Sequence, residues 1–173
     1  MVTIRIARDE DAALLAQVGG QAFTEAFGPD NNPQDLADYL SGAFSESIQR
    51  AEVAESGSVF FIAEDDGTPC GYARLRRKTP PAFVRGKNPC ELQRFYVLKD
   101  WWGKGAAHDL MRAVVDEASR LGYGALWLGV WQKNPRAIAF YQKWGFQIVG
   151  ETTFVIGSDV QHDHVMVREM EGR

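Results

Sequence analysis

The chain has 173 residues, of which 45% are hydrophobic, so we expect one globular domain over residues 1–173 with enough apolar residues for a core. No apolar run approaches the roughly 20 residues of a membrane span and no secretory leader is recognisable, which favours a cytoplasmic protein with no membrane partner. The formal net charge of −4 makes nucleic acid a poor partner.

The N-terminal part of the chain predicts a short strand followed by two helices. Residues 3–7 alternate between side chains of different polarity, as a half-buried strand does. A polar helix start follows at about residue 10, and we expect this helix to end near Gly28. Asn32 as N-cap and Pro33 in the first turn then open a second helix, which we expect to end at about residue 44.

Two runs of β-forming residues come next, at residues 58–65 and 69–77. The dipeptide between them, Asp66 and Gly67, is typical of a tight β-turn, so these runs predict an antiparallel hairpin. Residues 79–90 are rich in proline and glycine and are expected to form an exposed loop.

The segment DWWGKGAAHDL, residues 100–110, lies between a predicted strand at residues 91–98 and a predicted helix. Gly122 is placed to end that helix, whose apolar positions are Leu110, Met111, Val114, Val115, Ala118 and Leu121. Glycine lets backbone N–H groups approach a ligand closely, and the first turn of a helix has N–H groups without internal partners and a partial positive charge. A phosphate group is the natural ligand for such a segment.

The C-terminal part continues the alternation of strands and helices. Residues 125–131, ALWLGVW, form a nearly continuous apolar run of the kind that is buried on both faces of a sheet. A short helix over residues 134–145 begins with Asn134 as N-cap, and residues 146–157 and 162–170 predict a closing hairpin. This order indicates a mixed α/β fold with a strand, a crossover helix and a strand at its centre.

Two common kinds of glycine-rich loop do not fit this sequence. A nucleotide-binding P-loop needs Ser or Thr after its lysine, but Lys104 is followed by Gly105. A dinucleotide-binding fingerprint needs a third glycine at the position of His108. Taken alone, the segment is also compatible with a tight strand-to-helix turn that binds nothing.

Residues 102–107 do fit the pattern Q/R-x-x-G-x-G/A of the GNAT acyltransferases. The runs ELQRFYVLKDWWGKG and LWLGVWQKNPRAIAFYQKWGF resemble the two signature motifs of that family in the right order, and the resemblance extends over nearly the whole chain. Together with QAFTEAFGPDNNPQDLADYLSGAFS, they are similar to the bacterial Pai-type spermidine/spermine N-acetyltransferases. The resemblance implies a single-domain α/β (α+β) fold with a mixed, mostly antiparallel central sheet and helices on both faces.

The resemblance also implies acetyl-CoA as co-substrate, and no metal. Backbone amides from Gly103 to His108 would face its pyrophosphate, the strand edge at residues 95–97 would pair with its pantetheine arm, and Asn134 would help to hold that arm. The implied cofactor-binding residues are Phe95, Tyr96, Val97, Trp102, Gly103, Lys104, Gly105, Ala106, Ala107, His108, Asn134, Ala137 and Lys143. Trp102 departs from the Gln or Arg usual in the family, so the resemblance gives its side chain no role.

Two side chains are the candidates for catalysis by the same resemblance. Tyr141, in the pattern N-x-x-A-x-x-x-Y, would protonate the leaving thiolate, and Glu91, at the start of a strand, would take the proton of the amine. Alternatively, Tyr141 is only an aromatic residue of the core and Glu91 only a solvated surface glutamate. A chain of water molecules can also take the place of a single catalytic base. His162 and His164 share one face of a strand, but two histidines make at most half of a metal site.

The charges divide unevenly along the chain. Residues 1–66 hold thirteen Asp and Glu against three Arg, whereas the remainder has a net charge of +6. The acidic part includes Glu25, Asp30, Asp35 and Asp38 on the first two predicted helices, which favours a cationic acceptor such as a polyamine. A peptide N-terminus or an amino sugar is the alternative acceptor, and a CoA-binding sensor is the alternative without catalysis. The sequence leaves the acceptor and the oligomeric state open, with a homodimer allowed.

Overall fold

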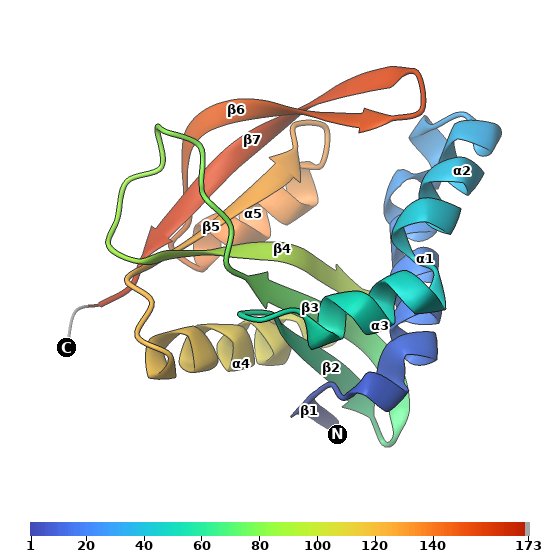
Figure 1. The fold of residues 1–173 in the computed structure, drawn as a ribbon, viewed down its shortest axis with the longest axis horizontal. Coiled ribbons are helices and arrows are strands. Elements are labelled where there is room, and N and C mark those ends of the chain that lie inside the picture. The colour runs from blue at the N-terminus through green and yellow to red at the C-terminus, as the bar shows by residue number, and fades with distance from the viewer. Residues whose placement is uncertain (172–173) are drawn as a thin grey trace.

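The structure, a computed structural model that describes residues 1–171, is built on one sheet of seven strands in the order β1-β2-β3-β4-β5-β7-β6 (Figure 1). All neighbouring strands are antiparallel except β4 and β5, which are parallel. The strands are β1 Val2–Ile6, β2 Val59–Asp65, β3 Thr68–Arg76, β4 Pro89–Val97, β5 Ala125–Trp131, β6 Gln147–Ile156 and β7 Asp159–Glu169. This mixed, mostly antiparallel sheet confirms the predicted fold class.

Helices cover both faces of the sheet, as predicted. The helices are α1 Ala12–Phe27, α2 Pro33–Ala43, α3 Glu46–Ala54, α4 Ala106–Arg120 and α5 Pro135–Lys143. Along β2, Phe60 and Ile62 pack with α1 and α2, whereas the alternate residues Phe61 and Ala63 pack with α4. The sheet therefore separates two apolar clusters, and the side chains of one strand supply both.

Helix α3 was not expected from the sequence. Its start is ordinary, since the Ser45 hydroxyl accepts a hydrogen bond from the amide of Ile48 at 3.3 Å. Its residues are mostly polar, however, and the helix is held to the sheet by charge. Arg74 on β3 is fully buried and forms ion pairs with Glu52 and Glu55 of α3. Pairing with a residue about twenty positions away leaves no local pattern in the sequence.

The parallel pair at the centre of the sheet determines where a ligand can enter. Strands β4 and β5 pair over only three positions, ending at Glu91 and Trp127, and α4 connects them as the predicted crossover helix. Beyond these positions the two strands separate, although β4 continues to Val97 and β5 to Trp131. Beyond Glu91 and Trp127, the backbone N–H and C=O groups on the facing edges of β4 and β5 therefore do not hydrogen-bond to each other.

No helix within the described part of the chain is long and apolar enough to cross a lipid bilayer.

Candidate active site

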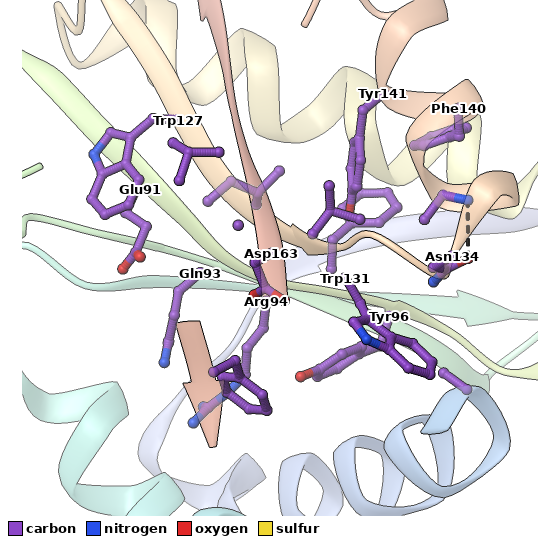
Figure 2. Close-up of a pocket in the computed structure, with 18 of the residues that line it drawn as sticks. Glu91, Gln93, Arg94, Tyr96, Trp127, Trp131, Asn134, Phe140, Tyr141 and Asp163 are labelled. Atoms are coloured by element: carbon purple, nitrogen blue, oxygen red, sulfur yellow. Dashed lines mark hydrogen bonds between the residues drawn. The ribbon is translucent and has the colours of Figure 1, made fainter. Parts of the chain in front are cut away.

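A cleft of about 1130 Å³ opens where β4 and β5 separate (Figure 2). Its walls come from both faces of the sheet. Phe23, Phe27 and Tyr39 of α1 and α2 lie on one side, and the first turn of α4 and most of α5 lie on the other. The start of the loop between β3 and β4, residues 78–81, also borders it. A cleft of this size holds a ligand of several hundred daltons.

The glycine-rich loop forms one end of this cleft. Gly103 has a φ of 74° and Gly105 a φ of 89°, which is the left-handed region that favours glycine. Gly105 is the N-cap of α4, and no side chain caps the helix there. The first N–H groups of a 15-residue helix therefore face the cleft without a side-chain partner, which suits an anionic ligand.

Two tryptophans fix the loop to the sheet. The indole N–H of Trp101 donates to Asp65 at 3.0 Å, and that of Trp102 donates to the carbonyl of Val97 at 2.8 Å. The guanidinium carbon of Arg136 lies 3.5 Å from the centre of the Trp102 ring. Trp102 thus anchors the loop and carries a stacked arginine, which gives a structural account of its departure from the family pattern.

The cleft brings together most of the predicted site residues. Those that border it are Glu91, Phe95, Tyr96, Val97, Trp102, Gly103, Gly105, Ala107, His108, Asn134, Ala137, Tyr141 and Lys143. Two do not: the Lys104 side chain is exposed outside the cleft, and the Ala106 side chain is completely buried in the core beneath α4. The amide of Ala106 nevertheless belongs to the first turn of the helix.

Tyr141 lies on α5, and Figure 2 shows its phenol directed into the cleft. Its ring packs edge-on against Phe95 and Phe146, with centroid distances of 6.1 Å and 5.7 Å. Burial raises the pKa of Tyr141 well above its ordinary value of 10, and the positive charge of Arg136 only partly opposes this shift. The phenol is therefore protonated at neutral pH and can act as a proton donor.

Glu91 also reaches the cleft, but with a charged partner that was not expected. Arg76 lies directly opposite on β3 and donates its Nε–H to the Glu91 carboxylate. The Glu91 side chain is only 10% exposed, so this ion pair is largely removed from water. Glu91 is therefore not a solvated surface glutamate, which was the alternative to a catalytic role.

Asp163 is a cleft residue that was not recognised in the sequence. It lies on β7 between His162 and His164, and strand alternation turns its carboxylate to the opposite face, into the cleft. Burial raises its pKa to about 6, while the two histidines act in the opposite direction. The alternation of the HDHVMV run was the available signal, because it separates the aspartate from the histidines.

The acidic residues of the first two helices do not border the cleft. Glu25 accepts a hydrogen bond from the amide of Lys99 at 3.2 Å, and Asp38 accepts one from Gln34 at 2.9 Å. Asp35 accepts a hydrogen bond from the hydroxyl of Ser158 at 3.4 Å. Their charges can therefore act on an acceptor at a distance but do not line its binding site.

Comparison with known proteins identifies the family of the chain. The profile of the Acetyltransferase (GNAT) family matches residues 22–146. An uncharacterised N-acetyltransferase of Mycobacterium tuberculosis is 36% identical over 161 residues, which cover 92% of this chain and 98% of the relative. A spermine/spermidine N(1)-acetyltransferase of Bacillus subtilis is 30% identical over 80 residues, about half of each protein.

Among solved structures, the PaiA N-acetyltransferase of Thermoplasma acidophilum, in complex with coenzyme A, superimposes with a TM-score of 0.80. The match covers 98% of this chain and 99% of the other at 20% identity, so it is evidence of a shared fold. Because the family profile covers most of the chain, the protein belongs to the GNAT family and is an N-acetyltransferase, an acyltransferase that uses acetyl-CoA.

Proposed function

We propose that the protein transfers the acetyl group of acetyl-CoA directly to a primary amine, and that the preferred acceptor is a polyamine such as spermidine or spermine. The observation that carries this proposal is one cleft that joins a helix start without a side-chain cap, a protonated phenol and two carboxylates. No covalent enzyme intermediate is needed, because the amine itself can attack the thioester.

The cofactor has a consistent place in the cleft. The amides of residues 103–108 are the proposed ligands of the pyrophosphate, with Arg136 and Lys143 close enough to the same end to add positive charge. The edge of β4 at residues 95–97, which has no strand partner on the side of β5, can hydrogen-bond the amides of the pantetheine arm as a further strand would, although the Val97 carbonyl already accepts a hydrogen bond from Trp102. Asn134 uses its carbonyl oxygen to cap α5, so only its NH₂ group is left to donate to that arm.

The chemistry requires a proton donor and a proton acceptor. A primary ammonium has a reference pKa of about 10.4, so the acceptor must lose a proton before it attacks. Tyr141 is the proposed acid that protonates the leaving thiolate, as the high pKa of its buried phenol allows. Two carboxylates border the cleft as candidates for the proton acceptor, Glu91 and Asp163.

Three features support a polyamine as acceptor. The lining of the cleft is rich in aromatic rings, among them Trp127 and Trp131 of β5, which attract cations at short range. Residues 1–66 add a net negative field that steers cations toward the cleft. The Bacillus subtilis relative is by name a polyamine acetyltransferase, although it matches only half of the chain.

An acceptor panel tests this proposal. CoA release is followed with spermidine, spermine, monoamines of equal length, peptides with a free N-terminus and amino sugars. We expect the highest kcat/KM for the polyamines, with a KM that rises with salt, because screening shortens the range of the field to about 8 Å at physiological ionic strength. A preference for peptide N-termini or amino sugars would reject the polyamine as acceptor.

A further inference from the structure

Asp163 differs from the other carboxylate of the cleft in having no charged partner. Glu91 is held by Arg76, whereas no hydrogen bond or ion pair within residues 1–171 involves the Asp163 side chain. The Asp163 side chain is half-buried in the cleft, and a partly desolvated carboxylate without a partner destabilises the fold, so a ligand or a reaction would account for its position. Because Asp163 borders the proposed active-site cleft, a role in the reaction is the explanation that we develop.

The surroundings of Asp163 leave room for a substrate atom. On β5, Gly129 is the exposed residue in an otherwise buried strand, and it lies just beyond the end of the parallel pairing with β4. A Cβ atom at Gly129 would lie 3.3 Å from Oδ2 of Asp163. The glycine therefore keeps open the space between the carboxylate and the point where the two strands separate.

The charges around Asp163 suit proton transfer at neutral pH. His162 and His164 flank it on β7, Tyr39 of α2 lies within range of its charge, and Glu91 and Arg94 border the same cleft from β4. Burial dominates over these groups, so Asp163 titrates near pH 6 and is largely ionised at pH 7 to 8. A base whose pKa lies just below the working pH accepts a proton efficiently.

Glu91 is less suited to the same task. Protonation of Glu91 would neutralise a carboxylate that holds the Arg76 guanidinium, and would leave that cation unpaired in a site that is largely excluded from water. Protonation of Asp163 breaks no contact.

We propose that Asp163 takes the proton of the acceptor amine, an inference that rests on the proposed acetyl transfer. The N–H bond of the ammonium breaks, and its proton goes to the Asp163 carboxylate. The nitrogen lone pair then forms the C–N bond with the thioester carbon. The C–S bond breaks with its electron pair on sulfur, which receives the Tyr141 proton. The second proton of the amine neutralises the tyrosinate, and Asp163 returns its own to solvent. Glu91 with Arg76 is then a positioning pair.

The test is a pH profile of kcat/KM for spermidine in four proteins. They are the wild type, Asp163→Asn, Glu91→Gln and, as a matched control, Glu151→Gln, which removes an exposed carboxylate from β6. The wild type should lose activity as the pH falls through about 6, because the base becomes protonated. Asp163→Asn should lower kcat/KM by about 10²- to 10⁴-fold and abolish this acid limb, with unchanged acetyl-CoA affinity.

The other variants separate the explanations. Glu91→Gln should keep the acid limb, and Glu151→Gln should match the wild type. Gly129→Ala should raise the KM for spermidine without weakening acetyl-CoA, because its methyl group enters the space beside Asp163. If Asp163→Asn retains the limb and most of the activity, or Glu91→Gln abolishes the limb, the assignment of Asp163 is overturned while acetyl transfer stands. A wild type that acetylates no amine overturns both.

Discussion

The conformation of Gly105 allows a test of the cofactor loop with a control at the other end of the same helix. Gly105 precedes α4 with a φ of 89°, and Gly122 follows it with a φ of 83°. An added Cβ meets nothing within 4 Å at either position. Valine at either site therefore costs folding free energy through backbone strain alone, about 1–2 kcal/mol. For a chain of this length, that corresponds to a fall in Tm of roughly 2–8 °C.

Only the Gly105 variant should affect the cofactor. The empty space beside Gly105 belongs to the cleft, so the valine side chain would occupy the approach to the helix N–H groups. A hydrogen bond to a charged group contributes about 1.5–3 kcal/mol, so losing one predicts a rise in the Kd for acetyl-CoA of about 10- to 150-fold. Gly122→Val should show a similar fall in Tm with an unchanged Kd.

The assays are titration calorimetry for the Kd and thermal unfolding for the Tm. Equal affinity in Gly105→Val and Gly122→Val, whether both are normal or both are weakened, would show that the loop does not bind the pyrophosphate.

Three further predictions concern catalysis and stability. Tyr141→Phe keeps the packing of the ring and removes only the proton, so turnover should fall by about 10- to 1000-fold with unchanged acetyl-CoA affinity; wild-type turnover under chemistry-limited conditions would remove Tyr141 from the mechanism. Because the pKa of Asp163 is about 6 in the fold and 3.8 without it, the folded state binds more protons between these values. The free energy of unfolding should therefore fall from pH 4 to pH 6 relative to Asp163→Asn, and parallel curves in urea titrations would contradict the raised pKa. Arg74→Met should cost about 1–3 kcal/mol in the same titrations, because it removes one partner of the Glu52 carboxylate, which then keeps only Arg94, and weakens the hold on α3; an unchanged free energy of unfolding would show that the network is not stabilising.

Elements with strong local end signals were predictable from the sequence. Helix α2 begins where Asn32 and Pro33 indicated, and the Asn32 side chain accepts hydrogen bonds from the amides of the first turn. The strand, crossover helix and strand around the glycine-rich loop were likewise predictable, because their apolar periodicity and glycines lie within about forty consecutive residues. Helix α3 was not, since its attachment depends on ion pairs with Arg74 of a later strand.

In the active site, too, residues in contiguous motifs were predictable, whereas contacts that depend on strand register were not. Tyr141 and the loop glycines belong to contiguous motifs, so the sequence pointed to them and the structure places them at one cleft. The partner of Glu91 depends on the register between β3 and β4, which brings Arg76 opposite it. Asp163 depends on the register of the last hairpin, which no short motif specifies.

Initial-rate kinetics with both substrates varied test the central claim most directly. If the amine bound in this cleft attacks acetyl-CoA itself, both substrates must be bound together, and double-reciprocal plots of CoA release against acetyl-CoA at several spermidine concentrations should intersect. Mass spectrometry should find the acetyl group on the polyamine alone. Parallel lines, with an acetylated protein isolated in the absence of amine, would contradict direct transfer, because they are the signs of a covalent enzyme intermediate.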